Sequence, residues 1–297
     1  VMWTEFVSAD GLMRATPEGK KKLLADLLYT EAERPIVAQL FTSDEGHMEA
    51  AAALCMELGF DGVDINMGCP DRAIERQGCG SAMIKNPSQA KAIIAAAKKG
   101  AKSETGGIPV SVKTRLGYNH DQLEEWLPQL LESGPAVITV HARTRKEMSK
   151  VPARWERVAA AVRLRDEVQS GATDKTLIIG NGDALSLPDS QAKAASSGAD
   201  GVMLGRAIFG NPWLFHPEKD RDTVSCEERL SVMVEHTKLF TELLPFKNFA
   251  IMKKHYKAYV KDFPGAANLR GKLMTLGTVE EIESEVNNFL SDPSQYY

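Results

Sequence analysis

Short apolar runs alternate with helical stretches from residue 4 to residue 204 of this 297-residue chain. The runs are rich in Val, Ile and Leu, which is the composition of strands that are buried on both faces of a sheet. Their alternation with helices predicts a parallel sheet whose strands are joined by crossover helices. The predicted strands are residues 4–8, 35–40, 61–65, 109–114, 136–141, 176–180 and 200–204.

The clearest predicted helix spans residues 86–100. Asn86 can cap its first turn, Pro87 suits the first helical position and Gly100 can end it. Two architectures accommodate such an alternation, a doubly wound sheet and a (β/α)8 barrel. They differ in where polar residues are expected to lie.

Polar or reactive residues follow almost every predicted strand. Residues from all round the fold that gather at the carboxyl ends of the strands are typical of a TIM barrel, so this α/β architecture is favoured. A closed barrel of this kind has eight strands and we count seven, so one βα unit is missing. The strand-end residues are Gln39, Asn66, Cys69, Lys113, Arg115, His141, Arg143, Asn181, Gly182, Asp183, Gly205 and Arg206.

Cysteine usage and charge restrict the classes of protein that fit. The chain has four cysteines, and Cys69 and Cys79 lie ten residues apart without the C-x-x-C spacing and nearby histidines of a metal site, so we expect no metal. The given sequence contains neither a secretory start nor an apolar run long enough to cross a bilayer. We therefore expect no membrane partner and a reducing, cytoplasmic location. The net charge of −4 means that any surface for nucleic acid must be local.

Five separated motifs resemble one family. The stretches "VDINMGCPDRAIERQGCGSAMIKNP", "VKTRLG", "HARTR", "IIGNGD" and "GVMLGRAIFGNPWLF" occur in the order and at the spacing of the tRNA-dihydrouridine synthases. The resemblance runs from about residue 4 to the carboxyl end, and it is specific because five motifs coincide.

The resemblance implies an FMN-binding barrel followed by a small all-helical tRNA-binding domain. We expect the barrel over residues 1–215 and the helical domain over residues 216–297, because the polar segment 216–225 ends the βα pattern. In the family, a strand with a Pro-Met-x-Gly-like loop precedes a segment like "TEFVSADGLMR". The given sequence starts after that strand, which agrees with the seven predicted strands where a barrel has eight. Two explanations are compatible with this: the sequence is a fragment, or the gene has no such segment.

The resemblance also assigns the residues that hold FMN. Loops after strands seven and eight of such barrels commonly bind phosphate, and glycines there let backbone N–H groups approach an anion. Without the resemblance, tight turns, a salt bridge of Lys113 and a core role of His141 would explain the same residues. The implied phosphate ligands are Asn181, Gly182, Asp183, Gly205 and Arg206, and the implied ring contacts are Gln39, Lys113 and His141.

Reduction of a uracil double bond needs a hydride on one carbon and a proton on the other. A thiol with a pKa of about 8.5 is protonated near neutral pH and can give up its proton. Cys69 matches the family's catalytic cysteine, so the resemblance implies hydride transfer from reduced FMN to C6 and proton transfer from Cys69 to C5. We interpret Cys79 as a packing residue.

A basic segment follows the predicted barrel. Between Phe246 and Met274 there are seven Lys or Arg residues against one acid, Asp262. Such a run is usually a solvated helix face, but its pattern resembles the tRNA-binding helices of the family. The expected RNA contacts are Lys253, Lys254 and Lys257, together with Asn66, Arg143 and Arg145.

The chain departs from the family pattern next to His141. The family commonly has glycine after the histidine, and a tyrosine and a glycine in the following loop. This chain has Ala142 and the loop "KEMSKVPARW". The departures bear on substrate contacts and leave the flavin assignment standing.

The favoured function is a monomeric flavoenzyme that reduces uridines in tRNA to dihydrouridine, with NADPH as the implied reductant. One alternative is an FMN barrel oxidoreductase of a free small molecule. Another is a tRNA-binding protein whose catalysis is impaired.

Overall fold

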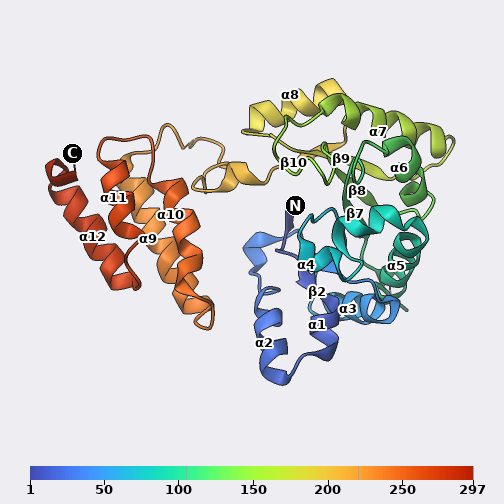
Figure 1. Cartoon of the computed structure of the whole chain (residues 1–297), viewed down its shortest axis with the longest axis horizontal. Helices are drawn as coiled ribbons and strands as arrows, with labels where there is room; N and C mark the ends of the chain where they lie inside the picture. Colours follow the sequence, from blue (N-terminus) through green and yellow to red (C-terminus); the bar gives the residue numbers. More distant parts are fainter. Residues whose placement is uncertain (105, 220, 297) are drawn as a thin grey trace. The chain divides into compact units, whose positions relative to one another are not determined.

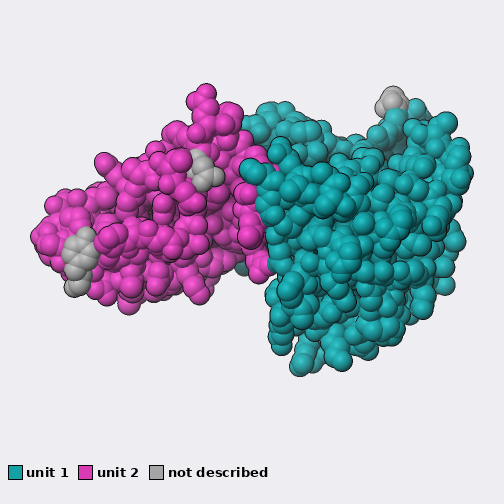
Figure 2. Space-filling model, turned by 90° about the horizontal axis from the view of Figure 1, so that it is seen from above, with its two compact units in different colours: residues 1–184, 188–204 teal, residues 185–187, 205–297 magenta. Residues whose placement is uncertain are grey.

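The computed structural model describes residues 1–104, 106–219 and 221–296. These residues form two compact units, coloured separately in Figure 2. The first unit is residues 1–184 and 188–204, and the second is residues 185–187 and 205–297. Asp220, in the predicted boundary segment 216–225, lies outside the described residues. Where the functional domains divide stays a prediction.

A curled parallel sheet forms the first unit (Figure 1). Its strands follow one another in sequence order, so each neighbour is reached through a crossover, as in a TIM barrel. Within the described part of the chain no ladder joins β10 to β1, and the sheet is an open half-barrel. The predicted fold class is therefore confirmed. The strands are β1 (Met2–Trp3), β2 (Val7–Ser8), β3 (Ile36–Phe41), β4 (Gly62–Met67), β7 (Val110–Arg115), β8 (Val137–His141), β9 (Leu177–Asn181) and β10 (Gly201–Met203).

Most predicted strands are shifted by only one or two residues at their ends, but of the strand predicted over residues 4–8 only Val7 and Ser8 form a strand. Two short strands, β1 and β2, pair there with β3. Between them the Thr4 hydroxyl oxygen accepts the backbone N–H of Gln39 at 3.0 Å. A side-chain oxygen thus takes the place of a backbone carbonyl, which interrupts the ladder.

Helices cover the outside of the sheet. Asn86 caps α5 by accepting the backbone N–H of Gln89, and Pro87 is its first residue, as predicted. Helix α5 packs against α3 and α6, and α6 packs against α7 (Figure 1). A hairpin of β5 (Lys102–Ser103) and β6 (Gly106–Gly107) stands apart from the main sheet. The helices, with the short 3-10 turns, are α1 (Ala9–Arg14), α2 (Pro17–Ala25), η1 (Glu31–Glu33), α3 (Glu45–Glu57), α4 (Arg72–Glu75), η2 (Gly80–Lys85), α5 (Pro87–Gly100), α6 (Leu123–Leu131), α7 (Trp155–Val168) and α8 (Leu187–Ser197).

The second unit is helical. Its apolar core includes Leu230, Met233, Tyr256, Leu269 and Ile282, which are all fully buried. This core is separate from the one between the sheet and the helices of the first unit. The elements are η3 (Arg206–Ile208), α9 (Cys226–Leu243), η4 (Phe249–Met252), α10 (Lys253–Tyr259), α11 (Ala266–Leu273), α12 (Val279–Ser291) and η5 (Pro293–Tyr296).

Candidate active site

The carboxyl ends of neighbouring strands bring several predicted site residues together. The register pairs Asn66 of β4 with Lys113 of β7. In the same way His141 of β8 lies opposite Asn181 of β9. Gln39 of β3 joins them, because the Asn66 amide donates to Gln39 Oε1 at 2.9 Å. Parallel strands end at one edge of a sheet, so these five residues share one site.

The turn that carries Cys69 is held by side chains on both sides. Asn66 Oδ1 accepts the backbone N–H groups of Gly68 and Cys69, at 3.1 and 2.9 Å. Arg115 Nε donates to the carbonyl of Gly68 at 2.7 Å. These bonds fix the backbone of Cys69 relative to β4 and β7. The contact of Asn66 with RNA stays a prediction.

The carbonyl of Cys69 is held as well. It accepts the backbone N–H of Ser81 at 3.0 Å, and the Ser81 hydroxyl lies 2.9 Å from the same oxygen. That hydroxyl is also 2.8 Å from Glu75, which forms a bidentate ion pair with Arg145. Arg145, predicted to contact RNA phosphate, therefore has a protein partner, and its contact with RNA stays a prediction.

The two cysteines of this segment differ in exposure. Cys69 is half-buried, whereas Cys79 is fully buried and packs against Phe41 and Ile74. Burial raises the pKa of the Cys69 thiol, and burial raises that of Cys79 to about 11. Both groups are thiols at neutral pH, and of the two only Cys69 is partly exposed. Cys79 packs as interpreted from the sequence.

A buried carboxyl, which sequence reasoning missed, supports Gln39. Asp64 is fully buried on β4 and accepts from Gln39 Nε2 at 2.7 Å and from Ser111 Oγ at 2.5 Å. Burial raises the pKa of Asp64 to about 6, against the opposing effects of these two hydrogen bonds and of the charge on Lys113. The signal in the sequence was an acid inside an apolar strand, which has to find partners.

Positive charge gathers beside this carboxyl. Lys113 Nζ donates to Asn181 Oδ1 at 3.3 Å, and the Asn181 amide donates to the carbonyl of Met203 at 2.8 Å. Burial, and secondarily the charge of Arg115, lowers the pKa of Lys113 to about 8. The site is therefore rich in donors and suited to a group that gains negative charge.

His141 is neutral at physiological pH. Burial lowers its pKa far below the ordinary value, and the charges of Arg115, Lys113 and Arg143 lower it further. A nitrogen of the Arg143 guanidinium lies 3.1 Å from His141 Nε2. Arg115 is the register partner of His141 in the β7–β8 ladder. A neutral imidazole has one N–H donor and one acceptor nitrogen.

Arg143 and the turn after β9 form a second supported group. The Arg143 side chain is only 3% exposed, forms an ion pair with Asp183 and donates to the carbonyl of Val151 at 2.6 Å. Gly182 has φ +122°, and a Cβ there would lie 2.8 Å from the Cβ of Ala153, so only glycine fits. The expected contacts of Arg143 with RNA, and of Gly182 and Asp183 with phosphate, stay predictions.

The remaining predicted residues belong to the second unit. Gly205 and Arg206 lead into η3, and their joint phosphate site with Asn181 stays a prediction. Lys254 and Lys257 are exposed on α10 and Lys253 is partly exposed. The Nζ of Lys254 lies 5.8 Å from the ring centre of Phe209.

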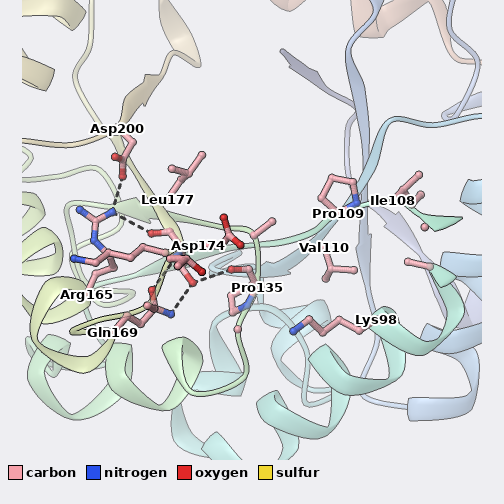
Figure 3. Close-up of a pocket in the computed structure, with 18 of the residues that line it drawn as sticks. Lys98, Ile108, Pro109, Val110, Pro135, Arg165, Gln169, Asp174, Leu177 and Asp200 are labelled. Atoms are coloured by element: carbon pink, nitrogen blue, oxygen red, sulfur yellow. Dashed lines mark hydrogen bonds and ion pairs between the residues drawn. The ribbon is translucent and has the colours of Figure 1, made fainter.

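A cavity of about 1240 Å³ lies at the opposite edge of the sheet, where β7, β8 and β9 begin (Figure 3). Arg165 crosses one of its walls, donating to the carbonyl of Thr176 at 3.1 Å and to Asp200 at 2.9 Å. Gln169 donates to the Thr176 hydroxyl at 3.0 Å. These polar groups satisfy one another, and the predicted site residues are at the other end of the strands.

Two features are absent from the described residues, a membrane-spanning helix and a cluster of metal ligands. No helix among these residues is long and apolar enough to cross a membrane. Outside Thr105, Asp220 and Tyr297, no group of three or more His, Cys, Asp or Glu side chains is placed to hold a metal ion.

Comparison with known proteins identifies the family. The family model described as dihydrouridine synthase matches residues 1–292. A probable tRNA-dihydrouridine synthase 2 of Bacillus subtilis (strain 168) is 38% identical over 298 residues, covering 97% of this chain and 86% of the relative. A probable tRNA-dihydrouridine synthase of Staphylococcus aureus (strain MRSA252) is 36% identical over 292 residues, covering 97% and 85%. The chain therefore belongs to the dihydrouridine synthase family.

Proposed function

We propose that this chain reduces uridines in tRNA to 5,6-dihydrouridine, with FMN as cofactor and NADPH as reductant. The observation that carries the proposal is the turn with Cys69, whose backbone is held by Asn66 and Arg115 at the edge of the sheet where Lys113 and His141 also lie. A proton donor beside a donor-rich site is what reduction of a polarised double bond requires.

The residues present fit a flavin. Its pyrimidine edge carries carbonyl and ring acceptors, which Gln39, Lys113 and the neutral His141 would meet with N–H groups. The tight turn at Gly182 would leave backbone N–H groups for the phosphate, with Asn181, Asp183, Gly205 and Arg206 completing that site. When bound, FMN supplies the hydride that goes to C6 of the uracil.

Cys69 gives the proton to C5. Burial keeps the thiol protonated until the reaction, and the nearby Arg115 guanidinium favours the thiolate that remains. The hydrogen bonds on both sides of Cys69 hold its backbone, so the point from which its side chain extends is fixed relative to β4 and β7.

RNA binding is assigned to the helical part of the chain, residues 216–297, and to Lys253, Lys254 and Lys257 in particular. These side chains are on one short helix at the surface, where they can neutralise phosphates. The barrel of residues 1–215 would then act on a uridine turned out of the RNA, with Asn66 at its site. We propose that the enzyme acts as a monomer in the cytoplasm.

The test uses the purified chain and an unmodified tRNA transcript. We expect a yellow protein that releases FMN on denaturation and forms dihydrouridine in the transcript with NADPH, measured by mass spectrometry of the nucleosides. A flavoprotein that leaves the transcript unchanged and reduces a free pyrimidine or enoate would establish the small-molecule alternative. A colourless protein that takes up no FMN but binds tRNA would establish the alternative of a tRNA-binding protein whose catalysis is impaired.

A further inference from the structure

We propose that the second unit holds a binding pocket for an unpaired nucleobase of the RNA, formed by Phe209, His236 and His255. The inference rests on the proposed function, because it assumes that the partner is RNA. It adds a base-stacking contact to a surface that so far offers only charge.

The pocket is a cavity of about 550 Å³ within the second unit. Residues 208–212 form one side of it, and α9 and α10 form the others. Gly210 lies so close to α10 that a Cβ on it would come within 2.5 Å of the backbone of Ala258. The segment that carries Phe209 is therefore fixed on α10, and the pocket is preformed. Its volume is within the range of roughly 300–1,000 Å³ typical of small-molecule sites.

Aromatic rings line the pocket. The rings of Phe209 and His255 are 5.5 Å apart with a tilt of 33°. His236 meets His255 edge to face at 4.8 Å, and its Nδ1 lies 3.4 Å from the hydroxyl of Tyr259. A nucleobase can stack against these rings, because every base has a π-face and base–aromatic stacking tolerates any sequence.

Part of this apolar lining is exposed to solvent. Phe209 is 41% exposed and Leu239, on the opposite wall, is 46% exposed. A partner of matching shape that binds here removes this apolar surface from water, which is favourable. Burial lowers the pKa of His255 to about 4, so the ring is uncharged at neutral pH and has one N–H donor and one acceptor nitrogen for a base.

The lining itself carries an acid, Glu235 of α9, and the positive charges that favour a nucleotide over an apolar peptide stand beside it on α10. Lys254 lies over the Phe209 ring, so a positive charge stands beside the stacking surface. Lys253 and Lys257 are on the same helix. A base in the pocket brings its own phosphate toward these lysines, and an apolar peptide has no group for them.

Binding of the unmodified transcript by the FMN-loaded full chain tests the proposal. Phe209→Leu keeps an apolar side chain and removes the ring, so we expect about 5- to 30-fold weaker binding. The slope of affinity against salt should not change, because stacking releases no counterions. Phe209→Trp should restore the affinity, and His255→Leu should weaken binding in the same way.

A matched control is Phe246→Leu, which removes an aromatic ring of similar exposure outside the pocket. Wild-type affinity of Phe209→Leu, in a preparation that forms dihydrouridine, would overturn the base pocket and leave the proposed function intact. Equal losses in Phe209→Leu and Phe246→Leu would also overturn it. A transcript labelled with 2-aminopurine in its unpaired loops gives a direct signal, because quenching should occur with wild type and disappear with Phe209→Leu. Failure of wild type to form dihydrouridine concerns the proposed function alone, since the binding data still decide the pocket.

Discussion

Positive charges in the two units have different surroundings. In the first unit the guanidinium of Arg115 donates to three backbone carbonyls, those of Gly68, Thr144 and Met148, and Arg143 and Arg145 are each paired with an acid. In the second unit Lys254 and Lys257 stand at the surface of α10. The difference teaches that an arginine at a strand end can position a site through its hydrogen bonds, whereas an exposed lysine on a helix face can meet a large anion.

The largest expected effect is at the centre of the positioned site. Cys69→Ala should keep the flavin spectrum and lower dihydrouridine formation by about 10²- to 10⁴-fold, because it removes the proposed proton donor. Single-turnover reduction of a transcript by the pre-reduced enzyme measures this step. Cys79→Ala is the control, and an inactive Cys79 variant beside an active Cys69 variant would reverse the two roles.

The next effect tests the exposed side of the comparison. Replacing Lys253, Lys254 and Lys257 together by Gln should weaken tRNA binding roughly 10- to 100-fold at low salt and reduce the salt slope by about 2 to 3. Affinity measured at several salt concentrations gives both quantities. The same change at Lys20, Lys21 and Lys22 of α2 alters net charge equally, and an equal loss there would mean that the effect is not local.

A smaller effect concerns the buried carboxyl. The pKa of Asp64 is raised to about 6, so the unfolded state loses this proton more easily than the folded state does. The free energy of unfolding should therefore fall as pH rises from about 4 to 6, by up to about 3 kcal/mol from this group. Asp64→Asn should remove that part of the pH dependence in urea unfolding.

Asp174→Asn is the control for this measurement, because Asp174 is an exposed aspartate of the same unit. If Asp64→Asn and wild type keep the same pH dependence, the carboxyl is not the buried group that the structure describes.

The smallest expected effect decides whether Arg145 positions the Cys69 turn or binds RNA. As a positioning residue it holds Glu75, which reaches Ser81 and hence the Cys69 turn. Arg145→Gln should then lower kcat by less than about 10-fold and leave the salt slope of tRNA binding unchanged. A slope reduced by about 1 with unchanged kcat would instead place Arg145 among the RNA contacts.

The sequence by itself determined the strand order, the helical carboxyl-terminal part and the residues at the strand ends. Strands buried on both faces need continuous apolar runs, and functional residues follow the strands in such sheets, so both features are local in the sequence. The helix after Asn86 was predictable for the same reason, since its cap and its proline are neighbours in the chain.

Only the tertiary structure decided which residues form hydrogen bonds and ion pairs with one another. Asp64 lies 25 positions from Gln39 and 47 from Ser111, and Arg145 lies 70 positions from Glu75. The split of the first strand likewise depends on Thr4 reaching Gln39. Hydrogen bonds and ion pairs act over a few ångströms of space regardless of separation along the chain, so no local pattern records them.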